Sequence, residues 1–418
     1  MTIQKLSGPD LSRETLALIL AGGNGTRLGE LTRWHCKPAI AFAGHFKNID
    51  FTLSNCVNSG VRRIGVLTQY KSQSLITHLA SGWNFLPRAL GEFVDIWPAQ
   101  QRLRSSWYAG TADAVYQNLD LIQAQRARYT LVLAGDHIYK MDYRALLEHH
   151  AASGAHVSVG CVPVPAEEAG SFGVLGIDSR QRVCSFIEKP HPGTLSTAPH
   201  ATVLASMGIY VFDTDYLVET LIADAAVEQS AHDFGRDILP SAVRQGHVCA
   251  FLFNDANGHA QYWRDVGTLE AYWHAHMELL APEPPIDLYD STWPILTKPE
   301  QLPPARLMCD SARHGGVANS LLAGGVVVRG ATVTNSVLAS NVHVGDSTVL
   351  DEAVVLPNAR IGANCRLRRV IVDAGVEIPD GTVAGASAAA GSELSRSSAR
   401  VTLLSHGTSE APGLRSVA

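Results

Sequence analysis

The stretch LILAGGNGTRL at residues 18–28 joins a run of aliphatic residues to a glycine-rich turn that ends in an arginine. Its aliphatic part belongs to a longer run, TLALILAG at residues 15–22, which predicts a buried β-strand. The turn lacks the Gly-Lys-Ser/Thr ending of a P-loop, and Leu28 stands where a GxGxxG motif has its third glycine. What remains is a turn whose backbone N–H groups could hold an anion, with Arg27 as a forked charged donor. A tight strand-to-helix turn with a surface arginine is the alternative interpretation.

Four further aliphatic runs predict strands of the same buried kind. They are RIGVLTQY (63–70), YTLVLAGD (129–136), HVSVGCVPV (156–164) and SMGIYVF (206–212). Between them lie longer stretches with apolar residues at helical spacing, such as residues 110–129. This alternation predicts an α/β fold with a mostly parallel, Rossmann-like sheet that helices cover on both faces. Ligands bind at the carboxyl ends of the strands in such sheets, so we expect functional residues there.

A second pattern follows a proline-rich segment. Residues 281–305 hold seven prolines and predict an extended linker. Beyond it, aliphatic residues recur every six positions in two series, and possible turn residues stand between them: Leu338, Val344, Leu350 and Leu356; Val349, Val355, Ile361 and Leu367; Gly345, Gly362, Asn358 and Asn364. A six-residue period predicts a hexapeptide parallel β-helix, whose coils stack their aliphatic residues inside. A strand-rich sandwich with a chance spacing is the alternative.

Composition narrows the class of protein. The chain has 418 residues, of which 46% are hydrophobic and 17% charged, and its formal net charge is −6. We therefore expect a globular protein without nucleic acid as a partner and without attachment to an anionic membrane. No apolar stretch approaches the roughly 20 residues that span a bilayer, and the first residues lack the apolar region of a signal peptide. The seven cysteines contain no CxxC pair, which predicts reduced thiols and a cytoplasmic location.

Two aspartates are candidate ligands of Mg²⁺. Asp136 ends the run YTLVLAGD, where a carboxylate would face the ligand crevice and could hold Mg²⁺. Asp265, in QYWRDVGT, could supply a second carboxylate, since Mg²⁺ uses one or two together with substrate phosphates. The alternatives are a helix N-cap for Asp136 and a salt bridge to Arg264 for Asp265.

The other candidate site residues each have a structural interpretation as well as a functional one. Lys189 in FIEKP could bind a phosphate and Glu188 sugar hydroxyls, although a solvated Glu-Lys pair would look the same. Tyr108 in SWYAGTADA could stack on a base or belong to the core. His343 in NVHVGD could serve a β-helix acyltransferase, although a structural histidine is the simpler interpretation.

These stretches together resemble the bacterial ADP-glucose pyrophosphorylase family, whose members are glucose-1-phosphate adenylyltransferases. The matching blocks are LILAGGNGTRL, KPAIAF, IDFTLSNCVNSG, GVLTQY, WYAGTADAVYQNLD, LAGDHIYKMDY, FGV, FIEKP, ASMGIYVFDTDYL, YWRDVGTLEAYW and STWPI. They follow the family's order and cover roughly residues 15–380. The opening loop is common to sugar nucleotidyltransferases, whereas WYAGTADAV, LAGDHIYK and YWRDVGTLEAYW point to the adenylyl branch.

The resemblance implies a domain plan and a reaction. It implies a nucleotidyltransferase domain over residues 1–285, a linker over 286–305, a left-handed β-helix over 306–390 and a tail over 391–418, usually in a homotetramer. The implied reaction converts ATP and α-D-glucose 1-phosphate to ADP-glucose and diphosphate with Mg²⁺, for glycogen or another α-glucan.

The resemblance also implies roles for the residues of the matching blocks. It implies that the triphosphate rests on Gly22, Gly23, Gly25 and Thr26. Arg27 would steady the leaving diphosphate, and Asp136 and Asp265 would hold Mg²⁺. Tyr108, Gly110 and Asp113 would lie on the nucleotide side. Lys189 would bind the phosphate of glucose 1-phosphate, and Glu188, Gly173 and Ser206 would line the sugar.

Several departures from the family concern regulation. Members that respond to sugar-phosphate activators have cations just after the glycine loop and in the helix after GTADAV. Here the corresponding positions are Asn24, Trp34, His35, Ala41, Ala109, Gln123 and Ala124, while Lys37 and Lys47 remain as candidates for an activator site. Losing several charge-assisted contacts weakens phosphate binding strongly, at about 1.5–3 kcal/mol each. We therefore expect activation by fructose 1,6-bisphosphate to be weak, absent or replaced by another effector.

Two further alternatives stay open besides the acyltransferase. One is a transferase that uses another nucleoside triphosphate, such as UTP or dTTP. The other is a non-catalytic regulatory subunit, which the retention of Asp136, Lys189 and Asp265 disfavours.

Overall fold

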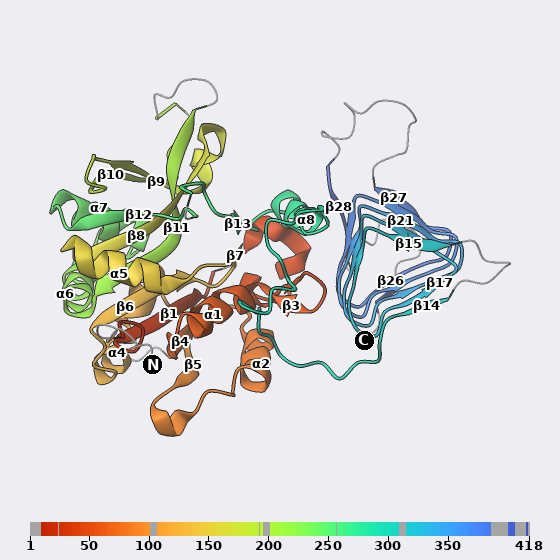
Figure 1. The fold of residues 1–418 in the computed structure, drawn as a ribbon, viewed down its shortest axis with the longest axis horizontal. Coiled ribbons are helices and arrows are strands. Elements are labelled where there is room, and N and C mark those ends of the chain that lie inside the picture. The colour runs from red at the N-terminus through yellow and green to blue at the C-terminus, as the bar shows by residue number, and fades with distance from the viewer. Residues whose placement is uncertain are drawn as a thin grey trace, which may run out of the picture.

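The computed structural model describes residues 10–23, 25–100, 107–191, 193–194, 201–255, 257–308, 315–385 and 400–405, and the backbone of residues 415–416. A domain of helices and strands stands beside a three-sided β-helix, and an extended segment connects them (Figure 1). Within this part of the chain, no helix is long and apolar enough to cross a membrane. The described cysteines are free thiols, whereas Cys309 lies outside the described residues.

The first domain is built on one mixed sheet. The strands of its parallel half are β5 (Phe93–Pro98), β4 (Arg63–Thr68), β1 (Thr15–Ala21) and β6 (Tyr129–Ala134), in that spatial order. The other half contains β11 (Thr202–Asp213), β8 (Val157–Pro165), β9 (Gly173–Ile177), β10 (Val183–Glu188) and β12 (Val248–Leu252). The five predicted strands are therefore present, but β11 runs antiparallel to β6, β8 and β9. A strand buried on both faces shows the same apolar pattern in either direction, so its connections decide the direction.

Helices cover both faces of this sheet. The α-helices are α1 (Asn48–Asn58), α2 (Gln73–Gly82), α3 (Thr111–Tyr116), α4 (Leu119–Ala124), α5 (Tyr143–Ser153), α6 (Thr214–Ala225), α7 (Leu239–Arg244) and α8 (Leu269–Glu278). Short turns of other helix types are η1 (Thr26–Thr32), η2 (Lys37–Ala39), η3 (Arg88–Leu90), η4 (Ala166–Ser171) and η5 (Phe234–Ile238). The helix expected over residues 110–129 is split into α3 and α4 at Asn118, whose side-chain amide donates to Ala114 O (2.8 Å). Asparagine side chains compete with the backbone in this way and disfavour a continuous helix.

Two small sheets complete the first domain. One pairs β2 (Ala41–Phe42) with β3 (Phe46–Lys47). The other pairs β7 (His137–Tyr139) with β13 (Trp263–Asp265). The second pair joins the end of β6 to a segment that comes much later in the chain, and it shapes the functional site.

The second domain is a parallel β-helix of short strands, in the left-handed class of the hexapeptide repeats. Within the described residues its strands form three sheets. The first contains β14 (Arg306–Met308), β17 (Val327–Arg329), β20 (His343–Val344), β23 (Arg360–Ile361), β26 (Val376–Ile378) and β29 (Arg415–Ser416). The second contains β15 (Gly316–Ala318), β18 (Thr332–Thr334), β21 (Val349–Asp351), β24 (Arg366–Arg368) and β27 (Val383–Gly385). The third contains β16 (Leu321–Leu322), β19 (Val337–Leu338), β22 (Val354–Val355), β25 (Val370–Val372) and β28 (Thr402–Leu404).

The stacked residues refine the six-residue period. Val337, Val354 and Ile371 face one another in successive coils, a repeat of 17 residues. The buried stack continues from Leu350 to Val355, a step of five. Leu356, which the strict period placed in the stack, instead belongs to the apolar cluster shared with the first domain. One corner of each coil therefore takes one residue fewer than the period predicts.

The two domains share a packed interface. Phe42 and Trp273 of the first domain belong to the same buried cluster as Val354 and Ile371 of the β-helix. The Trp273 indole donates to Glu352 O (2.8 Å). The segment after α8 is also held, because Thr297 donates to the buried carboxylate of Asp50 (2.6 Å). The connecting segment is therefore fixed to the first domain by side chains.

Candidate active site

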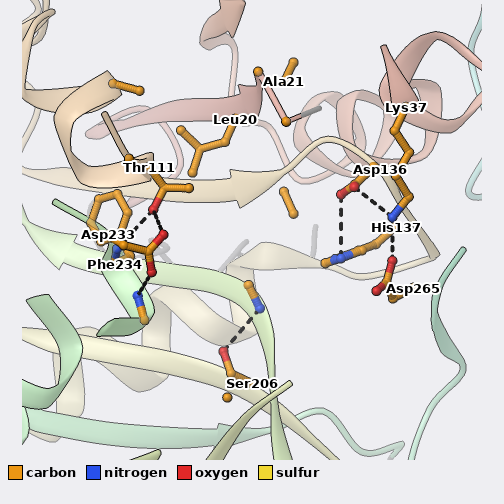
Figure 2. A pocket seen from close by; sticks show the side chains of 18 of the residues that line it. Leu20, Ala21, Lys37, Thr111, Asp136, His137, Ser206, Asp233, Phe234 and Asp265 are labelled. Carbon is orange, nitrogen blue, oxygen red and sulfur yellow. Dashed lines mark hydrogen bonds and ion pairs between the residues drawn. The ribbon is translucent and has the colours of Figure 1, made fainter. Parts of the chain in front are cut away.

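A cleft of about 640 Å³ opens at the carboxyl ends of β1, β4 and β6, where the sheet predicts a ligand site. Most of the residues predicted for the site line it: Gly22, Gly23, Arg27, Tyr108, Gly110, Asp136, Gly173, Glu188, Lys189, Ser206 and Asp265. Figure 2 shows one part of the cleft around Lys37, Asp136 and Asp265 and another around Thr111 and Asp233. The glycine turn and the sugar-binding candidates thus share one cavity.

The pairing of β7 with β13 brings the two aspartates together. Asp136 directly precedes β7, and Asp265 is the last residue of β13, where it pairs with His137. Both carboxylates contact one ammonium: Lys37 Nζ lies 2.8 Å from Asp136 Oδ2 and 2.5 Å from Asp265 Oδ1. Arg27 Nη2 lies 3.7 Å from Asp265 Oδ2. Two carboxylates and two cations therefore meet at one end of the cleft.

The structural alternatives for these aspartates do not hold. The segment after Asp136 is the strand β7, so the residue caps no helix. Arg264 pairs with Glu278 (2.6 Å between Nη2 and Oε1), and Asp265 with Lys37. Both carboxylates line the cleft, and both are ion-paired with Lys37 there.

Electrostatics keep Asp136 and Lys37 ionised. Burial alone would raise the pKa of Asp136, but Lys37 and then His137 outweigh burial and hold the pKa at about 2. Burial would lower the pKa of Lys37, yet Asp136 and Asp265 raise it above its usual value. At neutral pH the cleft therefore contains a buried ammonium between two carboxylates.

The glycine turn depends on the missing side chains of its glycines. Gly25 has a left-handed backbone (φ 59°), and a Cβ there would lie 2.9 Å from Thr32 Cγ2. A Cβ on Gly22 would lie 3.3 Å from Gln69 Cβ. Gly25 and Thr26 are predicted site residues that are not among the residues lining the cleft, and Thr26 is the first residue of η1. Asn24 lies outside the described residues. Gly22 and Gly25 are therefore closely packed at the end of β1, whereas a Cβ on Gly23 would meet nothing within 4 Å.

The sugar-binding candidates form a second group. Lys189 Nζ pairs with Glu188 Oε1 (3.0 Å), and the Lys189 side chain is more than half exposed. Ser206 Oγ lies 3.2 Å from the Tyr210 hydroxyl and accepts from Gly208 N (3.3 Å). A Cβ on Gly173 would overlap the Phe186 ring. The group thus presents one exposed cation and several oxygen atoms.

Hydrogen bonds with Asp113 and Asn118 fix the segment that carries Tyr108 and Gly110. Asp113 is buried, and its carboxylate accepts from Ala109 N (2.9 Å) and Gln117 Nε2 (2.8 Å). The Tyr108 hydroxyl accepts from Asn118 Nδ2 (3.0 Å). Asp113 is not among the described residues that line the cleft. It therefore acts on the site by holding the loop that carries Tyr108 and Gly110.

The two lysines predicted for an activator site lie in different surroundings. Lys37 is in the cleft between the two carboxylates. Lys47 lies outside the cleft lining, and burial lowers its pKa, against the opposite effect of the nearby Asp50. His343 also lies away from the cleft, on β20 of the β-helix.

Several cleft residues were missed by sequence reasoning. They are Gln69, His137, Asp233, Phe234 and Trp263, together with the position of Lys37. Among the described residues, Gln69 Nε2 and His137 Nδ1 are buried and have no hydrogen-bond partner. Gln69 comes directly after β4, so the rule for strand ends could have found it. Asp233 accepts from Thr111 Oγ1 (2.9 Å). These residues are 122 positions apart in the sequence, so their contact could not be predicted from it.

Comparisons with known proteins agree with this geometry. Residues 16–281 match the nucleotidyl transferase family, and residues 303–403 match the GlmU-like C-terminal hexapeptide family. Glucose-1-phosphate adenylyltransferase 2 of Pseudoalteromonas atlantica is 51% identical over 90% of this chain and 90% of its own. The glucose-1-phosphate adenylyltransferases of Teredinibacter turnerae and Paramagnetospirillum magneticum are 51% and 52% identical, over 90% of this chain and 90% and 89% of theirs.

Proposed function

The chain belongs to the glucose-1-phosphate adenylyltransferase family of nucleotidyl transferases, and on that premise we propose how its cleft performs the reaction. The enzyme converts ATP and α-D-glucose 1-phosphate to ADP-glucose and diphosphate. The observation that supports the assignment best is the convergence of Asp136, Asp265, Lys37 and Arg27 beside the glycine turn. Phosphoryl chemistry needs this kind of charge neutralisation.

The reaction is an in-line displacement at phosphorus. A phosphate oxygen of glucose 1-phosphate forms a bond to the α-phosphorus of ATP, and the bond between that phosphorus and the bridging oxygen to the β-phosphate breaks. Diphosphate carries away the electron pair. No covalent enzyme intermediate is required, so the protein contributes orientation and electrostatic stabilisation.

The nucleotide binds along the glycine turn. The N–H groups of Gly22, Gly23, Gly25 and Thr26 would donate to the triphosphate. Arg27 would neutralise the leaving diphosphate. Tyr108 and Gly110 would border the base and ribose, and Asp113 would fix their loop. The Gln69 amide, whose Nε2 has no hydrogen-bond partner among the described residues, would pair with the base, since an amide can donate to and accept from adenine together.

Glucose 1-phosphate binds at the sugar-binding candidates of the cleft lining, around Lys189 and Glu188. Lys189 would bind its phosphate, since its ammonium is exposed in the cleft next to Glu188. Glu188 and Ser206 would hydrogen-bond the sugar hydroxyls, and Gly173 leaves room beside them. The two substrates would thus meet between Lys189 and the Asp136–Asp265 pair.

The residues present suit Mg²⁺. Asp136 and Asp265 converge within reach of one ammonium, so a cation in its place would meet both carboxylates. No group of three or more His, Cys, Asp and Glu side chains converges within the described residues, and Mg²⁺ typically uses one or two carboxylates plus substrate phosphates. When bound, the ion would supply Lewis-acid stabilisation of the phosphate charge.

The response to effectors is the second part of the proposal. The Trp34 side chain is 71% exposed, and His35 Nδ1 is hydrogen-bonded to Ser74 Oγ (2.9 Å). Burial and then Lys47 lower the pKa of His35, so the ring is neutral at pH 7 and contributes no charge. Weak or absent activation by fructose 1,6-bisphosphate, or another effector in its place, follows from this loss of cations.

Two further points extend the assignment. Catalysis would reside in residues 1–285, and the β-helix of residues 306–390 would serve assembly, with a homotetramer as the proposed state. The ADP-glucose would supply the synthesis of glycogen or another α-glucan.

One assay tests the function. Purified protein receives glucose 1-phosphate and Mg²⁺ with each of ATP, UTP, dTTP and GTP, and chromatography measures sugar nucleotide formed. We expect ADP-glucose and diphosphate in equal amounts with ATP and far slower product formation with the others. A faster rate with another nucleotide would favour a different transferase, and no product from any of them would favour a regulatory subunit.

A further inference from the structure

Lys37 occupies the point on which the two carboxylates converge. Its ammonium lies 2.8 Å from Asp136 Oδ2 and 2.5 Å from Asp265 Oδ1 (Figure 2). The residue is only 7% exposed, so water screens these contacts weakly. An ammonium and a divalent cation cannot both occupy this point, so they compete for the same oxygens.

The charges around this point already balance. Asp136 and Asp265 contribute two negative charges, and Lys37 and Arg27 contribute two positive charges. A divalent cation that entered alone would leave an uncompensated double charge in a poorly solvated place. A triphosphate brings more negative charge than the cation brings positive, so the pair enters without that cost.

The ammonium can move while its backbone stays in place. Lys37 O accepts from Ile40 N (3.2 Å) and from Asn48 Nδ2 (3.0 Å), which fixes the main chain at the start of η2. The glycine turn passes beside the side chain: a Cβ on Gly25 would lie 3.5 Å from Lys37 Cβ. A triphosphate held by that turn is thus within reach of the flexible lysine side chain.

We propose that Lys37 and the divalent cation exchange places. In the free enzyme Lys37 bridges Asp136 and Asp265. When the nucleotide enters with its cation, the cation takes over the carboxylates and the ammonium moves to triphosphate oxygens. The enzyme therefore retains the divalent cation only together with nucleotide. The identity of nucleotide and cation rests on the proposed function.

Retention of Mn²⁺ by the protein during ultrafiltration tests this exchange. Wild type, K37M, K37R and K140M are compared with and without ATP, in the absence of glucose 1-phosphate. K140M is the matched control, because Lys140 also pairs with an aspartate, Asp290 (3.2 Å), but lies outside the cleft lining. Thermal unfolding with and without Mn²⁺ gives a second readout and shows which variants fold.

We expect wild type, K37R and K140M to retain Mn²⁺ only with ATP. Without nucleotide, K37M should bind Mn²⁺ more tightly than wild type by on the order of tenfold or more, since one positive charge is gone. Mn²⁺ should raise the melting temperature of K37M but not that of wild type, K37R or K140M. In the double variant K37M/D136N, Mn²⁺ should no longer raise the melting temperature.

Equal Mn²⁺ affinity of wild type and K37M, or the same gain in K140M, would overturn the exchange. If K37M does not fold, the wild-type arm still decides, because tight Mn²⁺ retention without ATP contradicts the proposal. ADP-glucose formation by the same wild-type preparation separates the two hypotheses. If wild type forms ADP-glucose but has the same Mn²⁺ affinity as K37M, the exchange is rejected and the proposed function is not. If wild type forms no ADP-glucose, the proposed function is rejected.

Discussion

Asp265 lies directly opposite His137 in the antiparallel pair that β13 forms with β7. Because Asp136 precedes His137, this pairing brings two carboxylates from distant parts of the chain to the ammonium of Lys37. The cluster is therefore assembled by a small sheet beside the main one. The geometry leads to five predictions.

Replacing Asp136 by asparagine should lower kcat by about 100-fold or more, since an oriented charge at the reacting phosphates is lost. Lys37 keeps Asp265 as a partner, so the fold should remain. Steady-state rates of ADP-glucose formation and circular dichroism measure both effects. D290N is the control, because Asp290 pairs with a lysine outside the cleft lining. A rate for D136N within a few-fold of wild type would remove Asp136 from the mechanism.

Replacing Lys189 by glutamine should raise the KM for glucose 1-phosphate and leave the KM for ATP nearly unchanged. One charge-assisted hydrogen bond is worth about 1.5–3 kcal/mol, which corresponds to an increase of roughly 10- to 150-fold. Initial rates at varied concentrations of each substrate provide the measurement. R182Q, which removes an exposed cation outside the cleft lining, should leave both KM values as they are. An unchanged KM for glucose 1-phosphate in K189Q contradicts the assignment.

Replacing Gln69 by leucine should relax the choice of nucleotide. The buried Nε2 has no partner among the described residues, so its pairing with adenine would favour ATP. We expect the ratio of kcat/KM for ATP to that for GTP to fall by about 10-fold, the effect of losing one such contact. Parallel rates with the two nucleotides test this. An unaltered ratio in Q69L would assign base selection to other groups.

His276 should make the fold sensitive to acid. Its Nε2 accepts from Ala43 N (3.1 Å), so the buried ring is neutral. Burial lowers the pKa of His276 from 6.5 to about 4. The unfolded chain therefore binds a proton between these pH values that the native state does not, and the native state loses stability as the pH falls from 6.5 to about 4.

The H276Q variant measures this effect, because glutamine can still accept from Ala43 N. Relative to H276Q, the free energy of unfolding of wild type should fall by about 3 kcal/mol over that range. Urea unfolding at pH 7 and at pH 4 provides the comparison. Equal pH slopes in the two proteins would show that the His276 ring binds its proton as readily in the native state as in the unfolded chain.

Fructose 1,6-bisphosphate should activate the wild-type enzyme weakly or not at all. Restoring cations in the W34K/H35R variant should create or strengthen activation, because exposed positions would again present charge to phosphate groups. Dose–response curves of the rate against the effector test both proteins. Saturable, many-fold activation of wild type at micromolar effector would contradict the prediction.

The apolar patterns of this sequence determined its architecture. The runs at residues 63–70 and 129–136 contain β4 and β6, and the segment with the six-residue period forms the β-helix. Such patterns are local, since they record which faces of an element are buried. For the same reason the sequence places Gly22, Asp136 and Lys189 at strand ends, and the cleft contains all three.

Only the tertiary structure decided where charges meet. Lys37 was expected in an activator site, yet it lies between Asp136 and Asp265, which approach through the β7–β13 pair. The direction of β11 and the shortened corner between Leu350 and Val355 were likewise absent from the patterns. Pairing partners, strand directions and ion pairs depend on contacts between distant segments. A hydrophobic pattern contains no information about these contacts, because burial of a side chain does not specify its neighbour.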